Sequence, residues 1–148
     1  MNSVLIVDDE SGIREILTRW LSAEGYEIRE APDAETALDE MSKAAAAVVL
    51  CDIEMPGDGG LWLASELGQR FPATAIVLAT AVDSVPPTVS LKPSIVAYLL
   101  KPFAQDRVVR AVARAMEWHG VAIATAPAAG GDDVATWLDS LAKGGELS

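Results

Sequence analysis

The stretch VVLCDIEMPGDGG at residues 48–60 is a short apolar run that ends in a carboxylate, Asp52, and continues into a glycine-rich loop. An apolar run of this length, bounded by turn residues, predicts a strand that is buried on both faces. Open α/β sheets place their ligands beyond the carboxyl ends of such strands. Asp52 is therefore a candidate functional residue, although aspartate is also common in turns and at helix N-caps.

Three other apolar runs also end in polar side chains. Residues 4–7 precede Asp8 and Asp9, residues 75–79 precede Thr80, and residues 96–100 precede Lys101. The carboxyl ends of parallel strands meet at one edge of a sheet. If these runs are parallel strands, three carboxylates, a hydroxyl and an ammonium group converge there.

Between these runs the apolar residues recur at the spacing of helices. Amphipathic helices are expected before Gly25, after the candidate N-cap Asp33, at about 61–71 and at about 104–118. Apolar and polar side chains alternate at residues 26–31, which predicts an edge strand. Strands and helices in alternation predict an α/β fold with a doubly wound parallel sheet and helices on both faces.

The segment from Ala81 to Ser94 departs from this alternation. A helix is due there, yet Pro86, Pro87 and Pro93 lie within it. Proline in a helix interior costs about 3 kcal/mol. The fourth helix is therefore expected to be short or irregular, at roughly residues 87–91.

Composition divides the chain into three parts. Residues 1–119 are expected to form one domain, and residues 120–131 are mostly alanine, glycine and proline, which predicts a linker. Residues 132–148 are expected to form a short amphipathic helix, at 132–143, and a tail.

The formal net charge of −11 argues against direct binding of nucleic acid or of an anionic membrane surface. No apolar run approaches the roughly 18 residues that would span a bilayer. The chain has one cysteine, Cys51, which excludes an internal disulfide and fits a reducing compartment. A cytoplasmic protein is expected, with Cys51 as a small buried side chain.

Three clustered carboxylates need a compensating cation, because like charges at close range raise one another's pKa. Oxygen ligands select a hard ion, and Mg²⁺ takes carboxylates while keeping positions for phosphate oxygens. A carboxylate beside Mg²⁺ can also act as a nucleophile toward phosphorus. Asp52 is the candidate acceptor because it is the lone acid at its strand end, whereas the paired Asp8 and Asp9 are typical of metal ligands.

Four motifs resemble the receiver domain of two-component response regulators over residues 1–119. They are Val7-Asp8-Asp9-Glu10, Asp52-Ile53-Glu54-Met55-Pro56 with Gly60 eight residues after the aspartate, Thr80-Ala81, and Tyr98-Leu99-Leu100-Lys101-Pro102-Phe103. Each motif is weak alone, but their order and spacing are specific. The resemblance implies a flavodoxin-like sheet with five parallel strands in the order 2-1-3-4-5.

The resemblance also implies the roles of the site residues. Asp52 would take a phosphoryl group from a phosphohistidine of a sensor histidine kinase or phosphotransfer protein, or from a small phosphodonor. Mg²⁺ would be bound by Asp9 and Asp52, by Asp8 largely through water, and by the backbone carbonyl of Glu54. Lys101 would pair with the phosphoryl oxygens, and the Lys101-Pro102 peptide would be cis. Thr80 and Tyr98 would form the switch pair.

The implied activity is limited to phosphorylation and dephosphorylation of the chain's own Asp52, and Glu54 is a candidate modulator of the dephosphorylating water. The partner is then a downstream output domain or protein, and a homodimer is a further candidate assembly. The chain is either a stand-alone receiver or the amino-terminal piece of a longer regulator, and we expect the second. The sequence does not name the kinase, the signal or the output.

The unusual segment 81–94 suggests that the face formed by the fourth helix, the fifth strand and the last long helix is remodelled, with the 132–143 helix covering part of it. Two other functions stay open at this point. A haloacid-dehalogenase-like aspartyl phosphatase would need a second aspartate two residues after Asp52, where Glu54 stands. A degenerate receiver that acts as a binding module is disfavoured because every chemical position is filled.

Overall fold

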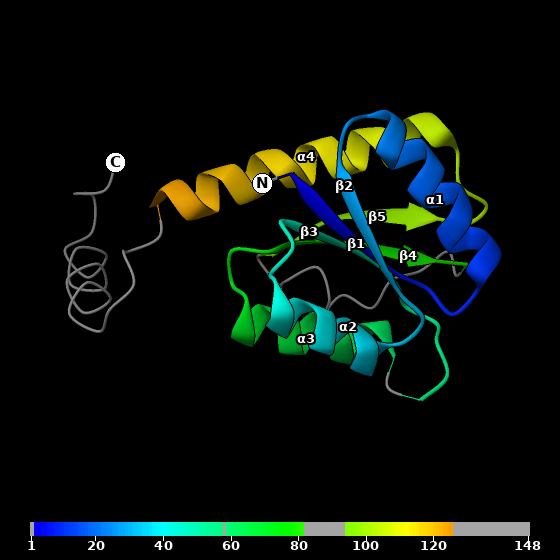
Figure 1. Cartoon of the computed structure of the whole chain (residues 1–148), viewed down its shortest axis with the longest axis horizontal. Coiled ribbons are helices and arrows are strands. Elements are labelled where there is room, and N and C mark those ends of the chain that lie inside the picture. Colours follow the sequence, from blue (N-terminus) through cyan, green and yellow to red (C-terminus); the bar gives the residue numbers. More distant parts are fainter. Residues whose placement is uncertain (1, 58, 82–93, 126–148) are drawn as a thin grey trace.

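The computed structural model describes residues 2–57, 59–81 and 94–125. Within these residues, five parallel strands form one sheet (Figure 1). The strands are β1 (Ser3–Val7), β2 (Glu27–Ala31), β3 (Val48–Asp52), β4 (Ala75–Thr80) and β5 (Ile95–Leu100). Their order is β2-β1-β3-β4-β5, and every neighbouring pair is parallel. The predicted fold is therefore confirmed.

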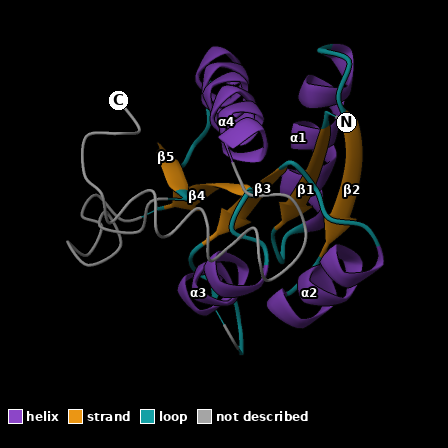
Figure 2. Cartoon of the chain, turned by 90° about the vertical axis from the view of Figure 1, so that its left-hand side faces the viewer, coloured by secondary structure: helices purple, strands orange, loops and turns teal. Residues whose placement is uncertain are grey.

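Helices cover both faces of the sheet (Figure 2). They are α1 (Ser11–Ala23), α2 (Ala34–Lys43), α3 (Gly60–Arg70) and α4 (Gln105–Thr125). α1 and α4 pack on one face, and α2 and α3 pack on the other. None of the helices within the described ranges combines the length and the apolar character needed to cross a membrane.

Two apolar cores lie on the opposite faces of the sheet because successive strand residues point to opposite sides. Val4 and Ile6 of β1 pack under α1 and α4, whereas Leu5 and Val7 pack under α2 and α3. Strands covered on both faces are apolar throughout, which is why β1, β3 and β4 appear in the sequence as uninterrupted apolar runs. Cys51 belongs to the second core, and burial raises the pKa of its thiol.

The last helix is longer than the sequence suggested. α4 continues to Thr125, so residues 120–125 are helical where a linker was expected from Gly120 onward. A single glycine costs a helix about 1 kcal/mol, which an established helix can absorb because adding a residue is easier than nucleating a helix. His119 anchors this part of α4 through a 2.7 Å contact between its Nδ1 and the carbonyl oxygen of Ala73. Beyond it, the end of α4 extends past the strands (Figure 1).

Three expectations fall outside the described residues. These are the short helix at residues 87–91, the remainder of the linker at residues 126–131, and the amphipathic helix at 132–143. The remodelled face and its cover by the 132–143 helix therefore stay predictions.

The Asp33 N-cap gives a testable contribution to stability. Its side chain accepts a 2.7 Å hydrogen bond from the backbone N–H of Thr36 at the start of α2. Asp33→Ala is expected to lower the free energy of unfolding by about 1 kcal/mol at neutral pH in urea denaturation. Asp33→Asn, which keeps a side-chain acceptor, should lose much less.

The same hydrogen bond lowers the pKa of Asp33 below its ordinary value of 3.8. A carboxyl group with a lowered folded-state pKa stabilises the protein above its unfolded-state pKa and loses that contribution as the pH falls through the folded-state pKa. The difference between the wild type and Asp33→Ala should therefore shrink below about pH 4. A difference that is constant down to acid pH would contradict this role.

Candidate functional site

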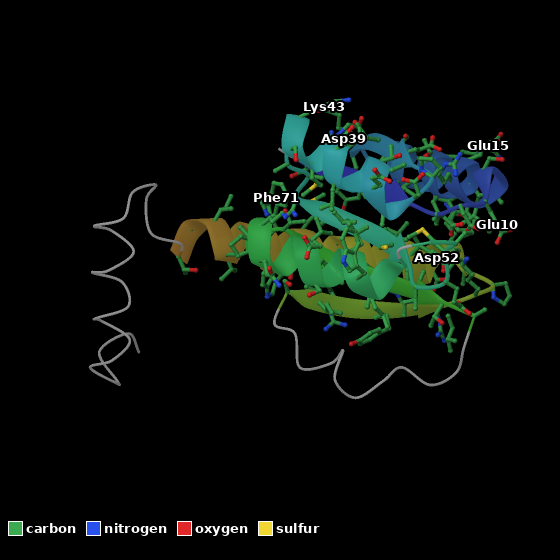
Figure 3. All side chains as sticks on the ribbon, turned by 90° about the horizontal axis from the view of Figure 1, so that it is seen from below. Glu10, Glu15, Asp39, Lys43, Asp52 and Phe71 are labelled. Atoms are coloured by element: carbon green, nitrogen blue, oxygen red, sulfur yellow. The ribbon has the colours of Figure 1, made fainter. Side chains whose placement is uncertain are left out.

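The carboxyl ends of the strands bring four chemically active side chains to one edge of the sheet. Asp52 and Thr80 are the last residues of β3 and β4, while Asp8 and Lys101 directly follow β1 and β5. Asp8, Asp52 and Thr80 are each 2 % exposed. Figure 3 shows Asp52 at the same end of the molecule as Glu10, with Phe71 toward the other end. The convergence predicted from the strand ends is present.

Lys101 lies between two of the carboxylates. Its Nζ is 3.1 Å from Oδ2 of Asp52 and 3.2 Å from Oδ2 of Asp8. The lysine side chain is 16 % exposed and those of the two aspartates are 2 % and 3 % exposed, so this interaction is largely shielded from water. The shielded ammonium group compensates the negative charge of both carboxylates, so the two acids can lie close together.

The backbone around Lys101 fixes its position. The Lys101-Pro102 peptide bond is cis, as the resemblance to receiver domains implied. The backbone N–H of Lys101 donates a 2.9 Å hydrogen bond to the carbonyl oxygen of Thr80. Lys101 is therefore attached to the end of β4 through its backbone and to the acids through its side chain.

Burial and charge shift the pKa values of the two central groups. Burial is the main reason that the pKa of Asp52 is raised, with Asp8 adding to it, although hydrogen bonds from Lys101 and the Glu54 backbone act against the shift. Burial alone would lower the pKa of Lys101, but its hydrogen bonds and charge interactions with Asp52 and Asp8 outweigh burial and raise it. The ammonium group therefore stays charged, and Asp52 is a more basic carboxylate than a solvated one.

A group of three consecutive acids borders this pair. Carboxylate oxygens of Asp8, Asp9 and Glu10 all lie within 4.8 Å of one another. Asp8 is buried, and Asp9 and Glu10 are exposed. The backbone N–H of Glu10 also donates a 2.9 Å hydrogen bond to Oδ1 of Asp8. Asp52 pairs with the same Lys101 ammonium group as Asp8 and adds a further carboxylate. Oxygen ligands of this kind are those that Mg²⁺ prefers.

Glu10 is the member of this group that the sequence interpretation gave no role. Its signal was present in the run Asp8-Asp9-Glu10, but a third consecutive acid is common on solvated surfaces. Arg14 supports the same loop, because its Nη1 donates a 2.6 Å hydrogen bond to the carbonyl oxygen of Asp8.

Glu54 connects the acceptor carboxylate to Thr80. Its backbone N–H donates a 3.2 Å hydrogen bond to Oδ1 of Asp52. Its side-chain Oε1 accepts a 3.1 Å hydrogen bond from the Thr80 hydroxyl and a 2.8 Å hydrogen bond from the backbone N–H of Ala81. The resemblance to receiver domains had implied a role for the Glu54 carbonyl, and Glu54 was a candidate modulator of the dephosphorylating water, but these two side-chain contacts were not predicted.

Tyr98 lies apart from the acids. It is 36 % exposed on β5 and lines a cavity of about 380 Å³ together with Phe103, Arg107, Arg110 and Arg114. The cavity lies between β5 and α4, and the acidic residues do not line it. The aromatic ring is thus at the surface in this conformation.

Gly60 is packed against the backbone of the acceptor. A Cβ atom on Gly60 would lie 2.1 Å from the carbonyl oxygen of Asp52 and 2.8 Å from its carbonyl carbon. The Gly60 N–H also donates a 3.1 Å hydrogen bond to the carbonyl oxygen of Ile53. The loop after Asp52 can fold back onto β3 only because this residue has no side chain.

Comparison with known proteins gives consistent matches. The response regulator receiver domain family matches residues 4–113. The chain is 36% identical over 115 residues to the DNA-binding transcriptional regulator NtrC of Klebsiella pneumoniae. This match covers 77% of this chain and 24% of NtrC. It is also 36% identical over 135 residues to the positive alginate biosynthesis regulatory protein of Pseudomonas aeruginosa, covering 87% of this chain and 54% of that protein. The chain thus spans about a quarter to a half of the length of these relatives.

Solved structures show the same fold. The response regulator TrrA of Thermotoga maritima, crystallised in complex with Mg²⁺-BeF, is 35% identical with a TM-score of 0.71, covering 78% of this chain and 99% of TrrA. A CheY-like receiver domain protein of Methanospirillum hungatei has a TM-score of 0.76 over 82% of this chain and 98% of its own, at 24% identity. These matches favour a receiver over the phosphatase alternative. The chain belongs to the response regulator receiver domain family.

Proposed function

We propose that Asp52 accepts a phosphoryl group from the phosphohistidine of a sensor histidine kinase or phosphotransfer protein, and that this changes the conformation that controls a downstream output. One observation carries the proposal: the buried Asp52 carboxylate lies 3.1 Å from a lysine ammonium group that also holds Asp8. A receiver acceptor needs this combination of a shielded nucleophile and a cation beside it.

The chemistry follows from the chain's own groups. An oxygen of Asp52 forms a bond to phosphorus while the bond from phosphorus to the donor imidazole nitrogen breaks, and the released imidazole takes up a proton. Phosphoryl transfer depends mainly on positioning and on neutralising charge on the phosphoryl oxygens. Lys101 supplies a charge next to Asp52 that can pair with these oxygens.

The acidic residues fit a magnesium ion. Asp8, Asp9 and Asp52 would hold Mg²⁺ together with the backbone carbonyl of Glu54, and Glu10 adds a carboxylate at the same edge. When bound, the ion would neutralise phosphoryl oxygens and offset the repulsion among the acids. The magnesium-bound structure of TrrA, a relative at 35% identity, supports this assignment.

The wider roles rest on the same proposal. Thr80 and Tyr98 would be the switch residues, and the chain would catalyse only its own phosphorylation and dephosphorylation. The part that this chain matches is 24% of NtrC and 54% of the alginate regulator, and NtrC is a DNA-binding transcriptional regulator, which supports an output domain or partner for this receiver. We place the protein in the cytoplasm, where a kinase partner could reach it, and a homodimer is one assembly through which it could act.

Phosphoryl uptake gives the test. Incubation of the full chain with acetyl phosphate and Mg²⁺ should add one phosphoryl group, as measured by intact mass. Asp52→Asn should remove all of this uptake, because a neutral amide is a poor nucleophile. EDTA should prevent uptake by the wild type.

The alternatives give different outcomes in this experiment and in a parallel incubation with p-nitrophenyl phosphate. Repeated turnover of p-nitrophenyl phosphate would support an aspartyl phosphatase, and unchanged mass with folded protein would indicate a receiver that is not phosphorylated. Uptake of equal size in Asp52→Asn would refute the assignment of the acceptor.

A further inference from the structure

We propose that the Glu54 carboxylate is a latch that holds Thr80 and Ala81 in the resting conformation and competes with a phosphoryl group on Asp52 for the Thr80 hydroxyl. The inference rests on the proposed function of Asp52. It gives the Glu54 side chain a positioning role in the switch, which is separate from metal binding by the Glu54 carbonyl and from any effect on the dephosphorylating water.

The contacts of Glu54 define the latch. One side-chain oxygen, Oε1, accepts hydrogen bonds from the Thr80 hydroxyl at 3.1 Å and from the Ala81 N–H at 2.8 Å. Glu54 is exposed, whereas Thr80 is 2 % exposed. The glutamate therefore reaches from the loop after β3 to the end of β4 and ties down the first residue beyond that strand.

The strand register places the latch beside the acceptor. Asp52 pairs with Ala79 of β4, so Thr80 lies one residue beyond the partner of Asp52. The backbone N–H of Glu54 also donates to Oδ1 of Asp52. The acceptor, the latch and the switch hydroxyl are thus connected through adjacent strand ends.

The Thr80 hydroxyl cannot donate to Glu54 and to a phosphoryl group on Asp52 at the same time. A threonine hydroxyl carries one hydrogen, and both a carboxylate and a phosphoryl oxygen act only as acceptors. While the Thr80 hydroxyl donates to Glu54, it cannot also donate to a phosphoryl oxygen on Asp52. A ligand shifts such an equilibrium only by the difference between its contacts in the two states, so the latch reduces the response to phosphorylation.

Replacing Glu54 should therefore strengthen binding of a phosphoryl mimic. The probe is beryllofluoride with Mg²⁺, titrated into the full chain and followed by the amide resonances of Thr80 and Ala81. Glu54→Ala keeps the backbone carbonyl and should bind beryllofluoride about tenfold more tightly than the wild type, since hydrogen bonds to a charged acceptor are the stronger ones. The Ala81 amide should also exchange with solvent faster in this variant without beryllofluoride.

Glu54→Gln separates the latch from simple charge repulsion. Glutamine retains an acceptor oxygen but has no charge, so it should bind beryllofluoride with an affinity between those of the wild type and Glu54→Ala. Equal gains in the two variants would mean that only charge matters and would overturn the latch. Glu117→Ala is the matched control, because it removes the same charge from an exposed site on α4 and should change affinity by less than about twofold.

A second background tests the competition itself. In Thr80→Ala the contested hydroxyl is absent, so adding Glu54→Ala should give a much smaller gain than it gives in the wild type. A full tenfold gain in that background would overturn the proposal. Absence of any Asp52-dependent binding in the wild type would instead contradict the proposed function, whereas normal wild-type binding with no gain in Glu54→Ala would contradict the latch alone.

Discussion

Gly60→Ala is expected to lower the free energy of unfolding by about 3 kcal/mol in urea denaturation of the full chain. The added Cβ would lie 2.1 Å from the Asp52 carbonyl oxygen and 2.8 Å from Cα of Ile53. These neighbours are backbone atoms, so no side-chain rotation can relieve the overlap. The start of α3 must move away from β3, and the acceptor loop must move with it.

Gly12→Ala provides the control for this substitution. Gly12 lies in α1, and apart from its chain neighbours and the backbone of its own helix no atom lies within 4 Å of the position that its Cβ would take. Alanine is the better helix former, so this variant should be as stable as the wild type or up to about 1 kcal/mol more stable. A Gly60→Ala variant within about 1 kcal/mol of the wild type would show that the acceptor loop does not pack on β3 as described.

Lys101→Met is expected to destabilise the protein by about 3 kcal/mol when no divalent cation is present. The substitution keeps a long side chain but removes the ammonium group that pairs with the nearly buried carboxylates of Asp8 and Asp52. Adding Mg²⁺ should recover much of the loss, because the ion can compensate the same acids. Urea denaturation with EDTA and with Mg²⁺ measures both effects.

Two further variants check the cause. Lys43→Met removes a 70 % exposed ammonium group that pairs with Glu40 on α2, and it should cost less than about 1 kcal/mol. Adding Asp52→Asn to Lys101→Met should recover part of the lost stability, because one of the two carboxylates that lost their ammonium partner is then neutral. If Lys101→Met costs no more than Lys43→Met with EDTA present, the bridging role of Lys101 is wrong.

Much of the site was predictable because the parallel sheet turns sequence order into position. Once residues 4–7, 48–52, 75–79 and 96–100 are taken as strands, the residue at each carboxyl end must lie at one edge. The meeting of Lys101 with Asp8 and Asp52 therefore follows from apolar runs and their final residues.

The parts that sequence reasoning missed depend on side-chain rotamers and on marginal propensities. Glu54 is exposed and its side chain has several rotatable bonds, so the spacing of motifs does not show that its oxygen reaches Thr80 and Ala81. The predicted end of the last helix lay before the observed end of α4 at Thr125. Glycine and alanine had indicated a linker there, but alanine is also the best helix former.

The most direct test of the central claim is to locate the phosphoryl group. After incubation with acetyl phosphate and Mg²⁺, borohydride converts an aspartyl phosphate to homoserine, and trypsin separates the peptide of residues 44–70 from that of residues 1–14. We expect homoserine at position 52 in the first peptide and unmodified aspartates at positions 8 and 9 in the second. Homoserine at position 8 or 9, with Asp52 intact, would contradict it.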